Sequence, residues 1–88
     1  MNLHLTGLNV LVTGASKGIG FAIAKAFVEE GAQVTIVSRS QENLNSAADK
    51  IYSVYKVKVK TIAADLSKSE NVKMLVEQTG DTDILVNN

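Results

Sequence analysis

The sequence contains no cysteine and no proline among its 88 residues. The absence of cysteine excludes disulfide bonds and thiolate metal sites, and it is typical of a cytoplasmic protein. The absence of proline carries no functional information. The single histidine, His4, precedes the first predicted strand and is expected to be a surface residue. The acidic residues do not lie at metal-ligand spacing with this histidine, so no metal site is predicted.

Long hydrophobic runs and an excess of charge of one sign are also missing. No apolar run approaches the roughly 20 residues that a membrane-spanning helix needs. Residues 1–10 lack the basic and apolar segments of a signal peptide. Nine basic and nine acidic residues give a formal net charge of zero. This balance favours neither nucleic acid nor an anionic membrane as a partner.

The sequence does contain a regular alternation of strand and helix patterns. Short apolar runs rich in β-branched residues predict buried strands at residues 9–13, 32–38, 57–65 and 83–88. The segments between them have apolar residues at helical spacing. The order is therefore β-α-β-α-β-α-β, and crossover helices require parallel strands because each returns the chain to the same edge. The predicted fold class is α/β, with a Rossmann-type doubly wound parallel sheet.

The ends of the predicted helices carry recognisable signals. Gly31 and Gly80 stand where a glycine would end the first and third helices. Ser40 is placed to cap the second helix, and residues 67–70, SKSE, match a capping box for the third. The apolar stripe of the first helix is expected to be Ile19, Ala22, Ile23, Ala26 and Phe27.

A glycine-rich loop, TGASKGIG at residues 13–20, lies between the first strand and the first helix. Gly14 allows a sharp turn, Gly18 allows close approach of a ligand to the backbone, and Gly20 allows the helix to pack against the sheet. The N–H groups from Ser16 onward lie at the positive end of the helix dipole, which suits a pyrophosphate. The alternative is a glycine-rich turn with no ligand.

Three motifs resemble those of the short-chain dehydrogenase/reductase family. TGASKGIG resembles the family's Thr-Gly-x-x-x-Gly-x-Gly cofactor loop, AADL at 63–66 its Asp-Leu pair, and DILVNN at 83–88 the start of its Asn-Asn-Ala-Gly motif. The resemblance implies a strand order of 3-2-1-4, an adenine contact by Asp65, and residues 1–88 as the N-terminal part of a single dinucleotide-binding domain. The implied cofactor-binding residues are Gly14, Ser16, Lys17, Gly18, Ile19, Gly20, Ser38, Arg39, Ser40, Asp65, Leu66, Asn87 and Asn88.

The end of the second predicted strand indicates which nicotinamide cofactor is bound. Ser38 stands where NAD sites usually carry an acidic residue for the ribose hydroxyls, and Arg39 follows it. A guanidinium pairs well with a 2′-phosphate. Lys17 adds a second cation, and Ser38 and Ser40 add hydroxyl donors. In the resembling family, basic residues at these positions accompany NADP(H), so NADP(H) is predicted over NAD(H).

The segment YSVYK at residues 52–56 matches the family's Tyr-x-x-x-Lys catalytic signature. Its position argues against catalysis, because it precedes Asp65, whereas the family's pair follows the Asn-Asn-Ala-Gly strand. We expect a partly buried aromatic residue and a solvated lysine. The family's catalytic serine, tyrosine and lysine have no counterparts within residues 1–88, so no catalytic residue is assigned.

The resemblance implies an NADP(H)-dependent oxidoreductase that acts on a small-molecule carbonyl or alcohol and forms a homo-oligomer. This chain would be its cofactor-binding part and not catalytic alone. Reductases of the 3-oxoacyl-carrier-protein branch look similar here, as do many others, so the substrate is not predicted. The alternatives are a non-catalytic nucleotide-binding module and a methyltransferase-like doubly wound protein. One sheet face, covered by a single helix, and the unprotected strand ILVN are expected to expose apolar surface.

Overall fold

The computed structural model describes residues 5–88, without the side chain of Val76. His4 lies outside these residues, so its surface position stays a prediction. The element order is the one predicted. The elements are β1 (Asn9–Thr13), α1 (Gly18–Glu29), β2 (Gln33–Ser38), α2 (Gln41–Tyr55), β3 (Lys60–Ala63), α3 (Ser69–Gln78) and β4 (Ile84–Val86).

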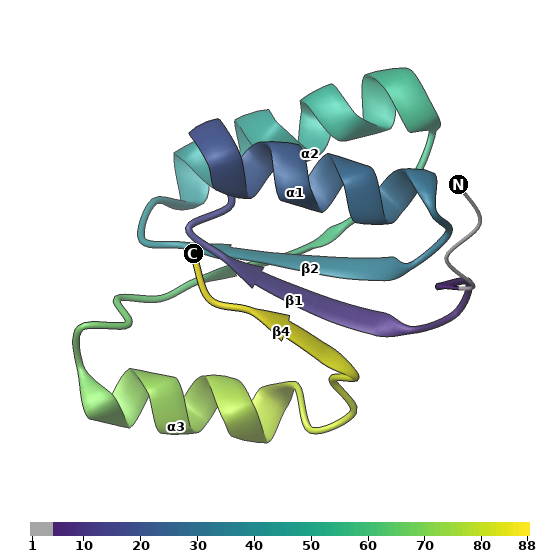
Figure 1. Ribbon diagram of the computed structural model, residues 1–88. Helices are drawn as coiled ribbons and strands as arrows, with labels where there is room; N and C mark the ends of the chain where they lie inside the picture. The colour runs from purple at the N-terminus through teal and green to yellow at the C-terminus, as the bar shows by residue number, and fades with distance from the viewer. Residues whose placement is uncertain (1–4) are drawn as a thin grey trace.

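The strands form one parallel sheet in the order β3-β2-β1-β4, which confirms the predicted topology. Helices α1 and α2 cover one face of the sheet, and α3 covers the other (Figure 1). Because the strands are parallel, their carboxyl ends meet at one edge, and the loops that follow them lie together there. No helix in the range 5–88 is both long and apolar enough to cross a bilayer.

Two strands are shorter than predicted. The third begins at Lys60 rather than at residue 57, and the fourth comprises only Ile84–Val86. Lys56 ends α2 in the left-handed conformation, with φ 57°, and the chain first pairs with β2 at Lys60. The Val-Lys alternation at 57–60 therefore belongs mostly to a connecting segment. At the other strand, residues 87 and 88 leave the ladder because they bond to the side chain of Thr13.

The main core lies between the sheet and the α1–α2 layer. Val10, Val12, Val34 and Ile36 point into it from the central strands, and Leu44, Ala47 and Ile51 enter it from α2. From α1 the buried residues are Gly20, Ala24 and Val28. The predicted α1 stripe was therefore only partly right: Ile23 and Phe27 are half-buried and pack against this core, but Ile19, Ala22 and Ala26 are exposed. The small residues Gly20 and Ala24 let the helix approach the sheet closely, and Ile19 is left 73% exposed.

The core on the α3 face is smaller. Its buried residues are Leu11, Val37 and Leu75. Leu85 lies on the same face, because it pairs with Leu11 in the parallel register, and it is 61% exposed. The rest of the uncovered face differs from the prediction of bare apolar surface. There the side chains of Gln33, Thr35 and Lys60, with the end of α3, line a polar groove.

The ends of α1 and α2 follow the sequence signals. Gly31 adopts φ +84°, and its N–H donates to the carbonyl of Val28 at 3.0 Å. The N–H of Ala32 donates to Phe27 at 3.1 Å, which completes a Schellman motif. At the start of α2, the N–H of Asn43 donates to the Ser40 hydroxyl at 3.1 Å, so the predicted cap is confirmed.

The predicted capping box of α3 was wrong. The helix begins after Lys68, which makes no side-chain cap bond, and Ser67 lies outside it. The hydroxyl of Ser67 donates instead to the Asp65 carboxylate at 2.7 Å. The helix ends at Gln78, where the Thr79 hydroxyl donates back to the Leu75 carbonyl at 2.7 Å. Gly80 follows this end without adopting a left-handed conformation.

Candidate functional site

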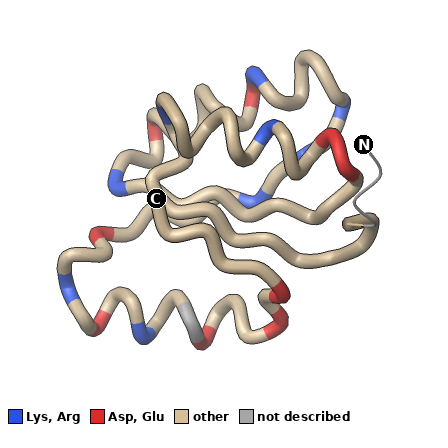
Figure 2. The backbone as a smooth tube through the Cα atoms, in the orientation of Figure 1, with Lys and Arg blue, Asp and Glu red and all other residues tan. Residues whose placement is uncertain are grey.

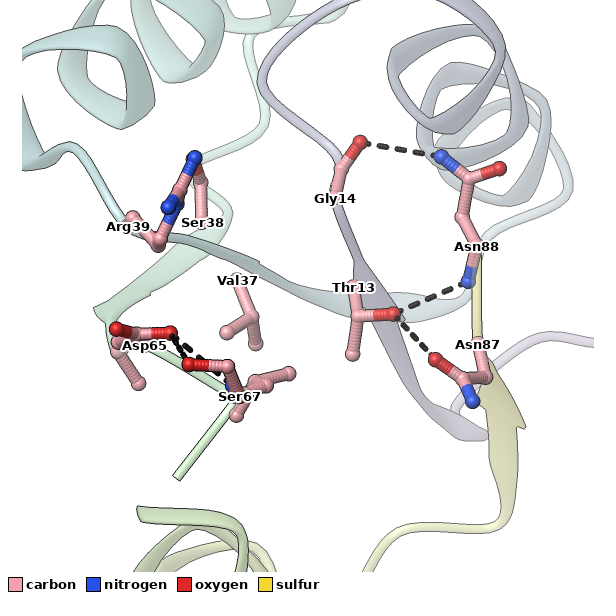
Figure 3. Close-up of a pocket in the computed structure, with 11 residues that line it drawn as sticks. Thr13, Gly14, Val37, Ser38, Arg39, Asp65, Ser67, Asn87 and Asn88 are labelled. Carbon is pink, nitrogen blue, oxygen red and sulfur yellow. Dashed lines mark hydrogen bonds between the residues drawn. The ribbon is translucent and has the colours of Figure 1, made fainter. Parts of the chain in front are cut away.

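A pocket of about 340 Å³ lies at the carboxyl ends of the strands (Figure 3). It brings together segments from the glycine loop, the end of β2, the loop after β3 and the end of β4. Seven of the residues predicted from sequence line it: Gly14, Ser38, Arg39, Asp65, Leu66, Asn87 and Asn88. Thr13, Val37, Ala64 and Ser67 also line it and were not among the predicted residues.

The other predicted residues lie around the pocket rather than in its lining. Ser16 is half-buried, and its hydroxyl lies 3.2 Å from that of Ser38. Ser40 caps α2, and its N–H donates to the Ser38 hydroxyl at 3.5 Å. Lys17 is exposed at the N-cap of α1. Gly18, Ile19 and Gly20 form the first turn of that helix.

The glycines of the loop have distinct geometric roles. Gly14 and Gly18 have φ +62° and +61°, a conformation that other residues adopt at a cost. A Cβ placed on Gly18 would meet no atom within 4 Å, so the space beside its backbone is open. A Cβ placed on Gly20 would lie 2.2 Å from the Gly14 carbonyl oxygen and 2.8 Å from Asn88 Nδ2. Close packing at Gly20 therefore permits no side chain.

The amino end of α1 is suited to an anion. Its N-cap residue, Lys17, makes no side-chain cap hydrogen bond. The first N–H groups of a helix have no partner within the helix, and they lie at the positive end of its dipole. The open space at Gly18 adjoins this end, and Lys17, whose side chain is exposed, is the N-cap residue itself. The loop can thus present backbone donors and positive charge to a phosphate group.

The hydroxyl of Thr13 joins the end of β4 to β1. This side chain is 5% exposed. It accepts a hydrogen bond from the Asn88 N–H at 3.1 Å, and its own proton can go to Asn87 Oδ1 at 3.2 Å or to the Val86 carbonyl at 3.4 Å. The amide Nδ2 of Asn88 donates to the Gly14 carbonyl at 3.3 Å (Figure 3). The sequence signal for Thr13 was its place at the head of the loop motif.

Asp65 is held by the residue two positions after it. Its Oδ1 accepts hydrogen bonds from the Ser67 hydroxyl at 2.7 Å and from the Ser67 N–H at 3.0 Å. The hydroxyl bond, then the N–H bond, and then the nearby charges of Arg39 and Lys68 lower the pKa of this carboxyl below its usual value. The Asp-x-Ser spacing is the signal that could have identified Ser67. An ionised carboxylate is thus fixed in the wall of the pocket.

The lowered pKa of Asp65 predicts a defined acid sensitivity. Because the folded state holds this carboxyl ionised, its contribution to stability is present above the ordinary value of 3.8 and is lost as the pH falls through the lower folded value. Asp65→Asn should therefore show a shallower loss of stability in acid than the unaltered chain. Ser67→Ala, which removes only the hydroxyl donor, should lie between them. Urea unfolding at several pH values between about 2 and 6 tests this, and three parallel curves would contradict it.

The Tyr-x-x-x-Lys segment lies away from this pocket. Helix α2 begins beside the carboxyl edge of the sheet and runs back to the opposite edge, where residues 52–56 lie (Figure 1). Tyr55 is half-buried and donates a hydrogen bond to Glu29, which raises the pKa of Tyr55. Tyr52 is 44% exposed, and the Lys56 ammonium lies 5.6 Å from its ring centre. Over residues 5–88, no group of three or more histidine or acidic side chains is placed to hold a metal ion.

Comparison with known proteins adds to this geometry. A family model described as short chain dehydrogenase matches residues 8–88. An uncharacterised oxidoreductase of Bacillus subtilis (strain 168) is 43% identical over 91 residues, an alignment that covers 100% of this chain and 34% of the relative. L-xylulose reductase of Bos taurus is 41% identical over 88 residues, with coverage of 100% and 34%.

Solved structures give the same result. The crystal structure of L-sorbose reductase from Gluconobacter frateurii, complexed with NADPH and L-sorbose, superposes with a TM-score of 0.90 and 38% sequence identity. The superposition covers 100% of this chain and 35% of that one. The chain thus spans about a third of the length of the relatives described here. With the family model matched from before β1 to the end of the chain, this protein belongs to the short-chain dehydrogenase family.

Proposed function

We propose that this chain is the cofactor-binding, N-terminal part of a single dinucleotide-binding domain in an NADP(H)-dependent oxidoreductase that interconverts carbonyls and alcohols. Family membership supports the oxidoreductase class, and the length of the relatives supports a larger whole. The observation that carries the cofactor proposal is the end of β2. There Ser38 and Arg39 line the pocket, at the position where NAD sites usually present a carboxylate.

The pocket and the glycine loop beside it offer groups that could bind the parts of a dinucleotide. The tight packing at Gly20 holds the amino end of α1 close to Gly14 and Asn88, and the open space at Gly18 leaves room for a phosphate beside that end. Asp65 and Leu66 would hold the adenine, with the carboxylate accepting a hydrogen bond from its amino group. Asn87 and Asn88 would form the wall next to the glycine loop. A bound nicotinamide cofactor supplies or accepts the hydride of the reaction.

The 2′-phosphate would be recognised by charge and by hydroxyl donors. Arg39 can pair with two phosphate oxygens, and Lys17 adds positive charge. The hydroxyls of Ser16 and Ser38 contact each other, so Ser38 can exchange this partner for a phosphate oxygen. NADPH in the L-sorbose reductase complex is a property of that protein, and it supports the same choice here.

We propose that catalysis by the complete protein requires groups other than those that residues 5–88 place at the pocket. Residues 52–56 lie at the opposite edge of the sheet, so we propose that the isolated chain has no turnover. We also propose that the complete protein is a homo-oligomer. Two of the relatives are named as reductases of different sugars, L-xylulose and L-sorbose, which leaves the substrate unassigned within the carbonyl and alcohol class.

The decisive variant is Arg39→Ala in the complete protein. Loss of charge-assisted bonds to a 2′-phosphate should raise the Kd for NADPH by about 10- to 100-fold and leave the Kd for NADH within about threefold. Lys68→Ala is the matched control, because Lys68 is also a cation near Asp65 but lies at the start of α3. Isothermal titration with both cofactors measures the ratio. Equal losses for NADPH and NADH would refute the 2′-phosphate role of Arg39.

The oxidoreductase activity itself needs a separate assay. The complete protein should oxidise NADPH in the presence of at least one member of a panel of small ketones, aldehydes and keto sugars. Binding of NADPH without turnover on any substrate would favour the alternative of a non-catalytic nucleotide-binding module.

A further inference from the structure

The register of β4 is fixed only in part by its own side chains. All three of its residues, Ile84, Leu85 and Val86, are apolar, and within the described chain it pairs with β1 alone. A slip of one residue would exchange the two faces of the strand. It would bring Leu85 to the main-core face, but it would also put Asp83 or Asn87 in the place of Ile84 or Val86, which pack against that core. Both of these apolar residues are only half-buried, so interactions at the ends of the strand must complete the selection of the observed register.

Hydrogen bonds at the amino end of β4 provide this selection. The Asn9 N–H donates to Asp83 Oδ2 at 2.8 Å, and the Asp83 N–H donates to the Asn9 carbonyl at 2.8 Å. The Asn9 side-chain amide also donates to the Asp81 carbonyl at 3.2 Å. We call these three bonds the Asn9–Asp83 clasp. Figure 2 shows the acidic residues of the turn between α3 and β4, at the end of the sheet away from the pocket.

The opposite end of β4 forms part of the pocket. Directly after the strand, the Asn88 N–H bonds to Thr13 and its side-chain amide bonds to the Gly14 carbonyl. Asn88 packs closely against the start of α1, because its Nδ2 lies only 2.8 Å from the position that a Cβ on Gly20 would take. A shift of β4 along β1 would remove Asn88 from the glycine loop. The clasp and the pocket wall are joined by only three residues of strand.

We propose that Asp83 is a positioning residue for nucleotide binding. Its carboxylate accepts from the backbone of Asn9 in the observed register, and this bond holds Asn88 against Gly14 at the far end of the strand. The inference rests on the proposed function, because it assigns a role in the binding of the same nucleotide. This role differs from a purely structural one, since it links Asp83, at the end of the sheet away from the pocket, to the affinity for the cofactor.

The test compares Asp83→Ala with Asp83→Asn in the complete protein. Asp83→Ala should raise the Kd for NADPH by about five- to tenfold and speed the hydrogen exchange of the Asn88 backbone N–H. Asp83→Asn keeps an acceptor oxygen and should restore most of both properties. Asp83→Glu keeps the charge but displaces the carboxylate, so it should weaken binding too. If Asp83→Ala does not fold, Asp83→Glu provides the same two measurements in its place.

A matched control separates positioning from loss of stability. Ile51→Val removes one methylene from the core beneath α2, far from β4, and should destabilise by about 0.5–1.5 kcal/mol without changing the Kd or the Asn88 exchange. Unchanged NADPH affinity and unchanged Asn88 exchange in Asp83→Ala and Asp83→Glu would overturn the proposal. An equal loss of affinity in Ile51→Val would overturn it as well. Failure of the unaltered protein to bind NADPH would instead contradict the proposed function, while the Asn88 exchange would still decide whether Asp83 sets the register.

Discussion

Gly20→Ala is expected to weaken nucleotide binding by more than about 100-fold, which corresponds to roughly 2.7 kcal/mol. The added Cβ would lie 2.2 Å from the Gly14 carbonyl oxygen and 2.8 Å from Asn88 Nδ2. Gly14 and Asn88 both line the pocket. The Gly14 oxygen belongs to the backbone, so this clash can be relieved only if the loop itself moves. The amino end of α1 must then shift away from β1. Nucleotide binding is weakened in two ways, because the N–H groups of α1 and the side-chain amide of Asn88 are displaced together.

Two other glycines provide comparisons for this variant. Gly18→Ala should destabilise the fold by about 1–2 kcal/mol through its left-handed backbone, since no atom of the chain lies within 4 Å of the added Cβ. It should also weaken NADPH binding, because the Cβ would enter the open space proposed for a phosphate. Gly80→Ala should be close to neutral, because its nearest neighbour is 4.0 Å away and its backbone is not left-handed. Urea unfolding should show the order of destabilisation Gly20, Gly18, Gly80, and NADPH titration should show weaker binding in Gly20→Ala and Gly18→Ala but not in Gly80→Ala. An unchanged Kd in Gly20→Ala would contradict the role assigned to its packing.

Leu44→Ala is expected to lower the free energy of unfolding by about 2–5 kcal/mol. Leu44 is fully buried in the main core, where it contributes to the α2 face together with Ala47 and Ile51. Removing its isobutyl group deletes transfer free energy and leaves a cavity that the sheet and two helices can only partly close. For a small domain this is a large share of the total stability of about 5–15 kcal/mol.

Val54→Ala on the same helix is the control for this second prediction. Val54 is 69% exposed, so its truncation should change stability by no more than about 0.5 kcal/mol. Urea unfolding measures both variants. Leu44 lies outside the pocket lining, so Leu44→Ala should keep its affinity for NADPH at temperatures where it is folded. Equal destabilisation by the two substitutions would contradict the assignment of the α2 face.

The overall topology could be predicted because it depends on patterns spread over the whole chain. Alternating strands and helices leave parallel pairing as the solution, and the family motifs implied the order 3-2-1-4, which is confirmed. Strand ends were harder to predict. The Val-Lys alternation at 57–60 satisfies the period of a strand, but whether those residues pair depends on where the chain returns to β2 after Lys56.

The candidate site shows the same limit at the level of side chains. Gly14, Arg39 and Asp65 could be located from motif and position, and the pocket brings them together. The contribution of Ser67 was missed, because two local interactions compete for its hydroxyl and the sequence does not rank them. A capping role for α3 and a bond to Asp65 both match the sequence, and the second is formed. The contact of Asp83 with Asn9 could not be predicted from local patterns, since the two residues are 74 positions apart in the chain.

The hydroxyl of Thr13 has a consequence for how binding and folding are linked. It joins residue 13 to residue 88, a separation of 75 positions, so the pocket wall is complete only after the last strand has docked. Closing so long a loop is entropically costly and belongs among the late steps of folding. A ligand that requires this wall selects molecules in which the whole sheet is assembled. Its binding free energy would therefore stabilise the entire chain, including the strand edge farthest from the ligand.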